Sequence, residues 1–333
     1  MLTLEDENAL IEDIKEGIDI AIYKGIQKGR FSEEDVLVDS IRLNKLAYLA
    51  IQDRDLDITF GWFKYGPAPV GTVSTDTAGQ HLANPRPTNE IAAHNESRIP
   101  NSGYLSSEGY AYYFLKDLEE FDKIITSDST KQMLVDFYQT YCPKDAKADR
   151  FTDLYVASAK LQQTLDQVGD GVSWHANKNE IYKKLDRRIG ELEFELEFYP
   201  ELEEAVGPFQ EYIRVLKDIL AEATEKEDLS QSQQRFISRI VGFYYNYAWK
   251  YVSLLISRNT IRGDNASQLR NSTDDDLTEI RDSYERELTA LRNRAELFDL
   301  SPEEVESGAG DIEPEETAYI ERWTSLSAEV IQK

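Results

Sequence analysis

No aspartate or glutamate occurs between Asp228 and Asp264, although the chain carries 63 acidic residues and a net charge of −26. Helical periodicity extends over residues 230–262, which would form a helix about 50 Å long if unbroken. Apolar side chains occupy most of its circumference. Because a helix that is apolar on nearly all sides is usually buried, we expect this segment to lie at the centre of a helical bundle.

Three basic residues share one polar stripe of this helix. Read at steps of three and four, the stripe consists of Arg235, Arg239, Gly242, Asn246, Lys250, Ser253 and Ser257. One interpretation pairs the stripe with a Glu-rich neighbour such as residues 191–197. A second makes it a groove for a partner or for nucleic acid, with the helix tyrosines stacking on bases. A membrane span over 236–256 is a third, and charged side chains inside lipid disfavour it.

The rest of the chain predicts further helices. Apolar residues recur at intervals of three and four over 151–168, 177–198, 202–224, 274–298 and 315–331, which is the pattern of helices with one buried face. In the first half, a helix is predicted over 33–52 with Ser32 as its N-cap. The outer face of 177–198 is dense in Glu, Lys and Arg, as in a coiled coil. The fold class expected is therefore mainly α.

A short aromatic segment interrupts the helices of the first half. Residues 58–63 alternate in the manner of a strand, and the pair Gly66-Pro67 is expected to end it. We expect Trp62 to pack in the core, because aromatic residues beside a tight turn usually pack a helix onto a strand. The sequence thus predicts a small β element within the N-terminal helices.

The residues around this turn match the pattern of a known family. They are Leu43, Lys45, Leu46 and Tyr48, followed by Trp62, Lys64, Tyr65, Gly66, Pro67 and Pro69. On these motifs the stretch 33–142 resembles the Panacea domain, the SocA-like antitoxin family. The chain departs from the family pattern at residues 71–103, a long insertion rich in Pro, Asn and Thr.

The resemblance implies a module that neutralises a partner protein, such as the toxin of a toxin–antitoxin or defence pair, by direct binding. We expect the contact surface to contain Lys64, Tyr65 and Pro67, together with His81 and His94 of the insertion. Because Lys64 and Tyr65 stand beside the turn, they are the better candidates for exposure.

Acidic residues are spread along the whole chain, where they outnumber the 37 basic residues. A dispersed acidic surface is typical of proteins that work in molar salt, as in a haloarchaeal cytoplasm. An ordinary acidic mesophilic protein is the alternative. The charge disfavours nonspecific binding to nucleic acid or to anionic membranes, although screening in molar salt weakens that argument.

Residues suited to catalysis are few. The chain has one cysteine, Cys142, which excludes an internal disulfide, and three histidines. His81 and His94 have no carboxylate or cysteine partner at ligand spacing, so no metal site is expected. Phosphate-binding, dinucleotide-binding and nucleophile-elbow motifs are absent from the sequence. The acidic N-terminus is unlike a signal peptide. We therefore expect a cytoplasmic, non-enzymatic protein without cofactors.

A second compact basic patch lies within the helix 177–198. Its residues are Lys183, Lys184, Arg187 and Arg188. Interspersed acids favour a solvated, salt-bridged face. Together with Arg235, Arg239 and Lys250, however, this patch is the basis of an alternative function, a nucleic-acid-associated regulator or defence component.

Two domains are predicted. Residues 1–145 would form the Panacea-like domain and residues 146–333 a bundle of long helices, with the polar segment 143–149 between them. The expected function is binding of a partner protein. A structural homo-oligomer built by the long helices is a further alternative.

Overall fold

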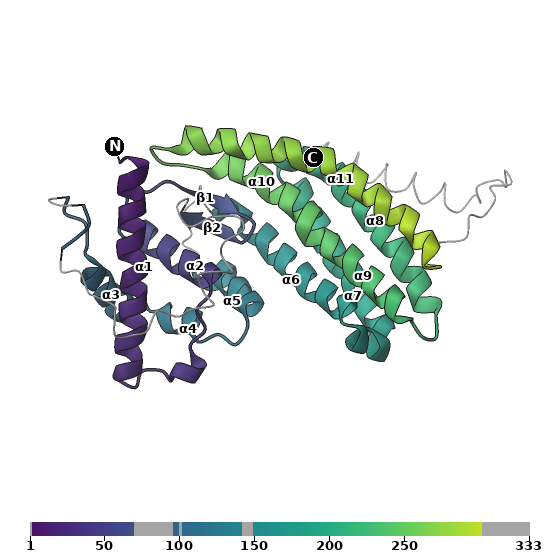
Figure 1. Ribbon diagram of the computed structural model, residues 1–333, viewed down its shortest axis with the longest axis horizontal. Helices are drawn as coiled ribbons and strands as arrows, with labels where there is room; N and C mark the ends of the chain where they lie inside the picture. Colours follow the sequence, from purple (N-terminus) through teal and green to yellow (C-terminus); the bar gives the residue numbers. More distant parts are fainter. Residues whose placement is uncertain (1, 70–95, 100–101, 142–148, 302–333) are drawn as a thin grey trace, which may run out of the picture.

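The computed structural model describes residues 2–69, 96–99, 102–141 and 149–301. Within this part the chain is mainly helical and holds one small antiparallel hairpin, which confirms the predicted fold class (Figure 1). His81, His94 and the helix predicted over 315–331 lie outside the described residues. Among the described helices, none has an apolar stretch of the length needed to cross a bilayer.

The N-terminal helices pack around α1, Leu4–Gln27. Helix α3, Ser107–Lys116, lies against it. The two backbones approach closely at Gly17, where a Cβ atom would lie 2.4 Å from Cβ of Tyr110. A residue without a side chain is therefore required at this crossing. Helices α4, Phe121–Ile125, and α5, Thr130–Asp136, complete this half, and α5 continues as a π-helical segment, Phe137–Tyr141.

The helix predicted over 33–52 begins later than expected. Glu33–Asp35 form a single 3₁₀ turn, and α2 spans Ser40–Asp53 with Asp39 as its N-cap. The Asp39 side chain accepts a hydrogen bond from the Arg42 backbone at 2.8 Å, whereas Ser32 makes no side-chain cap bond. Tertiary pairing keeps the chain extended between them, because the Leu37 N–H donates to the Ile125 carbonyl at 2.8 Å. Local cap chemistry alone therefore predicted the wrong start.

The hairpin consists of β1, Phe60–Phe63, and β2, Gly66–Pro69. The pair Gly66-Pro67 was expected to end the strand, but it begins a second one that is paired from Phe63↔Gly66 to Phe60↔Pro69. Prolines are tolerated here because β2 is an edge strand. On the other side of β1, Phe60 exchanges two backbone hydrogen bonds with Arg262, of 2.9 and 2.8 Å. The hairpin thus joins the N-terminal helices to the end of α10, Trp249–Thr260.

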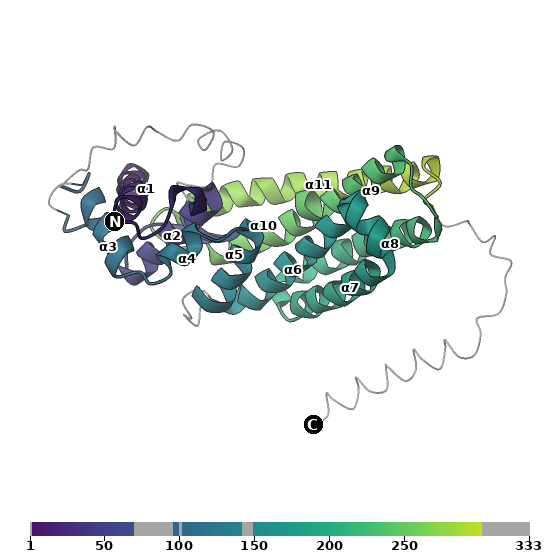
Figure 2. The same ribbon diagram turned by 90° about the horizontal axis from the view of Figure 1, so that it is seen from below.

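Long helices build the second half. They are α6, Thr152–Gly169; α7, Gly171–Glu197; α8, Glu203–Glu225; α9, Gln231–Phe243; α10, Trp249–Thr260; and α11, Ala266–Leu297. Helix α7 has non-helical backbone angles at Asn177, where the sequence predicted its start. Figures 1 and 2 show α6 to α11 side by side, with α10 reaching back to the hairpin.

The acid-free segment forms α9, a π-helical segment Tyr244–Ala248, and α10 in direct succession. Its apolar side chains are buried, with Ile240, Tyr244 and Leu255 all 0% exposed. Helices α6, α8 and α11 contact it. The expectation of a central, buried helix is therefore met on its apolar sides.

Candidate functional site

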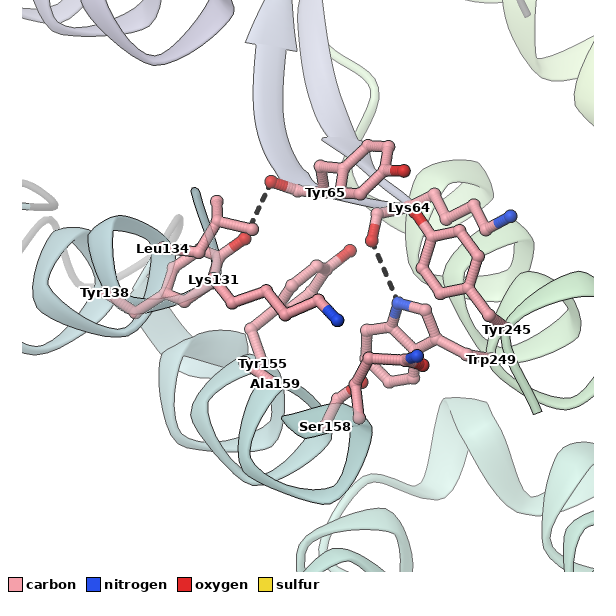
Figure 3. Close-up of a pocket in the computed structure, with 11 residues that line it drawn as sticks. Lys64, Tyr65, Lys131, Leu134, Tyr138, Tyr155, Ser158, Ala159, Tyr245 and Trp249 are labelled. Atoms are coloured by element: carbon pink, nitrogen blue, oxygen red, sulfur yellow. Dashed lines mark hydrogen bonds between the residues drawn. The ribbon is translucent and has the colours of Figure 1, made fainter. Parts of the chain in front are cut away.

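Three aromatic side chains hold the turn of the hairpin from three different helices. The Tyr155 hydroxyl donates to the Phe63 carbonyl. Nε1 of Trp249 donates to the Lys64 carbonyl at 2.9 Å, and the Tyr138 hydroxyl donates to the Tyr65 carbonyl at 2.6 Å (Figure 3). Three consecutive carbonyls thus each have an aromatic donor. Because buried carbonyls need partners, this arrangement fixes the turn in one conformation.

Gly66 is required by the same arrangement. Its φ of +83° lies in the left-handed region that favours glycine. A Cβ atom there would also lie 2.4 Å from the Tyr138 hydroxyl, the donor to Tyr65. Any larger residue would therefore displace Tyr138 and loosen the turn.

A pocket of about 230 Å³ opens beneath this turn. It is lined by Lys64, Tyr65, Lys131, Leu134, Tyr138, Tyr155, Ser158, Ala159, Gln162, Tyr245 and Trp249 (Figure 3). The polar side-chain atoms of Tyr138, Tyr155 and Trp249 are already hydrogen-bonded to the turn. A ligand in the pocket would therefore contact mainly the faces of their rings. The pocket lies where the hairpin meets α5, α6 and α10, the kind of junction at which ligand sites often form.

Two lysines give the pocket positive charge. The Lys64 ammonium lies 3.5 Å from the centre of the Tyr245 ring, in cation–π contact. Burial, with repulsion from Lys250, lowers the pKa of Lys64 to about 8. The ammonium of Lys131 pairs with Asp166, and burial lowers the pKa of Lys131 as well. An anion in the pocket would favour the charged form of both amines.

Two of the pocket tyrosines, Tyr155 and Tyr245, remain un-ionised near neutral pH. Burial raises the pKa of Tyr155 well above its usual range. Burial, followed by the nearby Tyr65, raises the pKa of Tyr245 in the same direction. Their hydroxyls are therefore neutral donors and poor general bases. Nor does the described lining contain a carboxylate, a histidine or a cysteine.

The residues expected to contact a partner are placed differently from one another. Lys64 and Tyr65 line the pocket, and Tyr65 is 41% exposed. Pro67 is buried in β2, where its carbonyl accepts a hydrogen bond from the buried Lys45 amine at 3.0 Å. Pro67 is therefore not exposed to a partner as predicted, because α2 covers this part of β2.

The basic residues of the nucleic-acid alternative are not gathered into one site. Lys250 is close enough to Lys64 to affect its titration and so belongs beside the pocket. Arg235 and Arg239 are exposed on α9 and have no ion pair within the described part of the chain. The pairing of this stripe with residues 191–197 is likewise not seen among the described side chains.

The patch of four basic residues lies on α7. Arg187 and Arg188 pair with Glu191 at 3.6 and 2.5 Å, and Lys184 donates to Gln167 at 3.2 Å. Lys183 is exposed. This is the salt-bridged face that interspersed charges predicted.

Sequence reasoning did not find the other pocket residues. Lys131, Tyr138, Tyr155 and Trp249 come from three helices that are distant in the chain, and no spacing rule connects them. In the described part of the chain, no group of three or more His, Cys, Asp or Glu residues could hold a metal ion.

One family model matches residues 1–330, and its description is "Domain of unknown function (DUF8098)". No curated protein and no solved structure matches the chain. The Panacea resemblance is therefore wrong, since another family covers almost the whole chain and the Panacea family gives no match. The motif that suggested it fixes a local turn through Trp62, Gly66 and Lys45, and a turn of this kind does not define a family. The expectation of a toxin as partner was drawn from that resemblance and loses its support.

Proposed function

We propose that this chain, which belongs to the DUF8098 family of unknown function, is a non-enzymatic, cytoplasmic protein that binds a partner protein through its hairpin turn. In this proposal the pocket beneath Lys64 and Tyr65 receives an aromatic side chain of the partner that has a carboxylate beside it, either the C-terminal carboxylate or that of a neighbouring acidic residue. The observation that supports it most is that Tyr138, Tyr155 and Trp249 all donate their side-chain hydrogen bonds to the turn, which leaves their ring faces to contact a ligand.

Ring surface and lysines together favour this anchor. Aromatic faces favour a flat apolar group, and burying such groups is the main source of affinity at interface hot spots. The lysine ammonium groups exclude a cation and attract a carboxylate. In a chain of net charge −26, the Lys64 ammonium at the pocket, with Lys250 near enough to affect its pKa and Lys131 paired with Asp166, provides a local positive charge that attracts an anionic anchor.

The lining also supports a binding role over a catalytic one. A general base needs a group that titrates near the working pH and reaches the substrate. Lys64, with its pKa lowered to about 8, is one such group, but the described lining places no carboxylate, histidine or cysteine beside it to complete a catalytic pair. Positioning and charge are what these residues supply.

Site-specific crosslinking tests the proposal in the full chain. A photoreactive benzoylphenylalanine replaces Tyr65 or, as the control, Tyr112, which is 64% exposed on α3. We expect one protein to crosslink from position 65 and not from position 112. Lys64→Glu in the position-65 protein should abolish the product, whereas Lys116→Glu, an exposed lysine on α3, should leave it unchanged. Equal crosslinking from both positions would contradict the proposal.

A small probe tests the anchor chemistry directly. N-acetylphenylalanine carries a ring and a carboxylate, and its amide is the matched neutral control. At roughly 0.3 kcal/mol per heavy atom its Kd should be about 1 mM. Binding is followed by ¹⁹F NMR of protein labelled with 5-fluorotryptophan, in which Trp249→Phe identifies the relevant signal. A shift with the amide equal to that with the acid would remove the charge argument.

A second candidate function keeps one supporting observation. Arg235 and Arg239 are exposed and have no ion pair among the described residues of an acidic chain, so they remain available to phosphate groups. This supports the alternative of nucleic-acid binding on α9. Arg235→Glu/Arg239→Glu should then abolish nucleic-acid retention, and unchanged retention would exclude this version.

A further inference from the structure

Helix α7 carries an ordered stripe on the side opposite to its core contacts. The core side consists of Ile181, Leu185, Ile189, Leu192 and Leu196, all 6% exposed or less. The opposite side consists of Lys183, Arg187, Gly190, Phe194 and Glu197, and Phe198 follows in the turn directly after the helix. Because steps of three and four residues return to the same face of a helix, these outer residues form one continuous stripe. Figure 2 shows α7 along the edge of the bundle.

Two phenylalanines on this stripe are unusually exposed. Phe194 is 70% and Phe198 is 71% exposed, and they lie one helical turn apart. Among the described residues, four large apolar side chains exceed 60% exposure, and these two form the one adjacent pair. A single exposed apolar residue needs no explanation, but an adjacent pair at the edge of a bundle is typical of an interaction surface.

The stripe has the spacing of a helix–helix seam. Positions 183, 187, 190, 194 and 197 follow one another at steps of four, three, four and three, which is the repeat by which paired helices interlock. Gly190 leaves a gap in this seam, since nothing in the described structure lies within 4 Å of a Cβ atom built there. A phenylalanine from a facing helix fits such a gap.

Charge along α7 selects the orientation of the facing helix. Taken over the whole helix, the part around the start of the stripe is mainly basic, with Lys183, Arg187 and Arg188 beside a single Asp186, and the part around its end is acidic, with Glu191 and Glu197. A parallel copy would place like charges together. An antiparallel copy places each basic half against an acidic half, which is the self-complementary pattern of a two-fold interface.

We propose that α7 forms the interface of a homodimer, packed antiparallel against α7 of a second copy. Phe194 of each chain then covers the gap at Gly190 of the other, and Arg187 faces Glu197 across the interface in the same register. The residues of this interface are not among those that line the pocket beneath the hairpin.

Salt strengthens this dimer. Two chains of charge −26 repel each other at low ionic strength. In 1 M salt the screening length falls to roughly 3 Å, which removes long-range repulsion and leaves the apolar seam intact. Sedimentation equilibrium of the full chain between 0.1 and 2 M KCl should therefore show dimer formation that increases with salt.

Phe194→Glu tests the seam. Because a buried aromatic at the centre of an interface is a hot spot, we expect the dimer dissociation constant to rise by about 30-fold or more. Tyr112→Glu is the matched control, an exposed aromatic on α3 given the same new charge, and it should leave the dissociation constant unchanged. Both positions are exposed, so both variants should fold, which far-UV circular dichroism checks.

A charge swap tests the orientation. Arg187→Glu alone and Glu197→Arg alone should each weaken the dimer, since each places two like charges across the interface. The double variant Arg187→Glu/Glu197→Arg should restore the wild-type dissociation constant if the helices are antiparallel. Failure of the double variant to restore association would overturn the antiparallel pairing. A chain that stays monomeric at every concentration and salt, or a dimer indifferent to Phe194→Glu, would overturn the interface itself.

Discussion

The pocket beneath the hairpin and the outer face of α7 both combine aromatic rings with lysine or arginine, yet they are built in opposite ways. The walls of the pocket come from α5, α6, α10 and the turn. The hydroxyl or indole N–H groups of three of its aromatic residues donate hydrogen bonds to main-chain carbonyls of the turn in the absence of a ligand. The face of α7 comes from one helix, and its two phenylalanines contact mainly water. The same residue types thus produce a rigid cavity in one place and an uncovered surface in the other.

This difference shows that burial by neighbouring elements, rather than helical periodicity, decides the role of an aromatic residue in this protein. Tyr155 and Phe194 both follow helical periodicity, but Tyr155 is 2% exposed and Phe194 is 70% exposed. Substitutions in the pocket region should therefore affect the free energy of unfolding of the monomer, whereas substitutions on α7 should affect association alone. Four measurements test this division, from the largest expected effect to the smallest.

Trp62→Ala should give the largest change. Trp62 is 1% exposed and packs against Tyr155, Tyr138 and Phe151, with ring centres 5.0 to 6.5 Å apart. Removing its side chain leaves a cavity behind the pocket, and we expect a loss of about 3–5 kcal/mol in unfolding free energy. Urea denaturation measures it. A loss below 1 kcal/mol would mean that the hairpin is not packed as described.

The pH dependence of stability should reveal Lys64. Its pKa is about 8 in the folded chain and near 10.5 when unfolded, so between these values the unfolded state binds more protons and stability rises with pH. After allowance for partial exposure the rise should be about 2 kcal/mol. Unfolding free energies from pH 7 to 10.5 are compared with those of Lys64→Gln, in which this rise should be missing. Parallel curves for the two proteins would show that Lys64 is not desolvated.

Trp249→Phe separates the hydrogen bond of the wall from its ring. The variant keeps an aromatic face but loses the donor to the Lys64 carbonyl. We expect a loss of about 1 kcal/mol in unfolding free energy, the typical contribution of one hydrogen bond. Thermal unfolding gives the stability change. A variant that is as stable as the wild type would indicate that water replaces the donor.

Phe194→Ala should have the smallest effect on the monomer. Because Phe194 is exposed, its loss should change the unfolding free energy by less than about 0.5 kcal/mol when measured at a concentration at which the chain is monomeric. The same urea titration as for Trp62→Ala provides the comparison. A large loss would place Phe194 in the core and erase the contrast between the two regions.

Periodicity predicted most of the architecture. The stripes in 177–198, 202–224 and 274–298 identify α7, α8 and α11 to within a turn or two at most ends, because a long helix must bury one face wherever it lies. Boundaries set by tertiary contacts were not predictable. Helix α2 begins at Ser40 because the strand-like bond from Leu37 to Ile125 keeps the chain extended, and Ser32 looked locally like an equally good cap.

The second strand and the pocket could not be read in the same way. Gly-Pro-Ala-Pro has the composition of a turn, and its partner strand β1 is held on its other side by Arg262, about 200 residues later in the chain. Lys64 and Tyr65 were selected from the sequence because they stand beside a tight turn. Their partners on α5, α6 and α10 carry no common spacing, because what unites them is the direction of their donors in space.

The hairpin also affects the order in which the protein can fold during its synthesis. The donors to its turn follow it by 73, 92 and 185 residues. At 5 to 20 residues per second, the ribosome needs about 10 to 40 s to deliver the last of them after the turn itself. During that interval the turn lacks at least one of its three aromatic hydrogen-bond donors. Closing so long a loop has an entropic cost that the formation of a local helix does not have. The turn of the hairpin therefore obtains its last hydrogen-bond donor only after α10 has been synthesised.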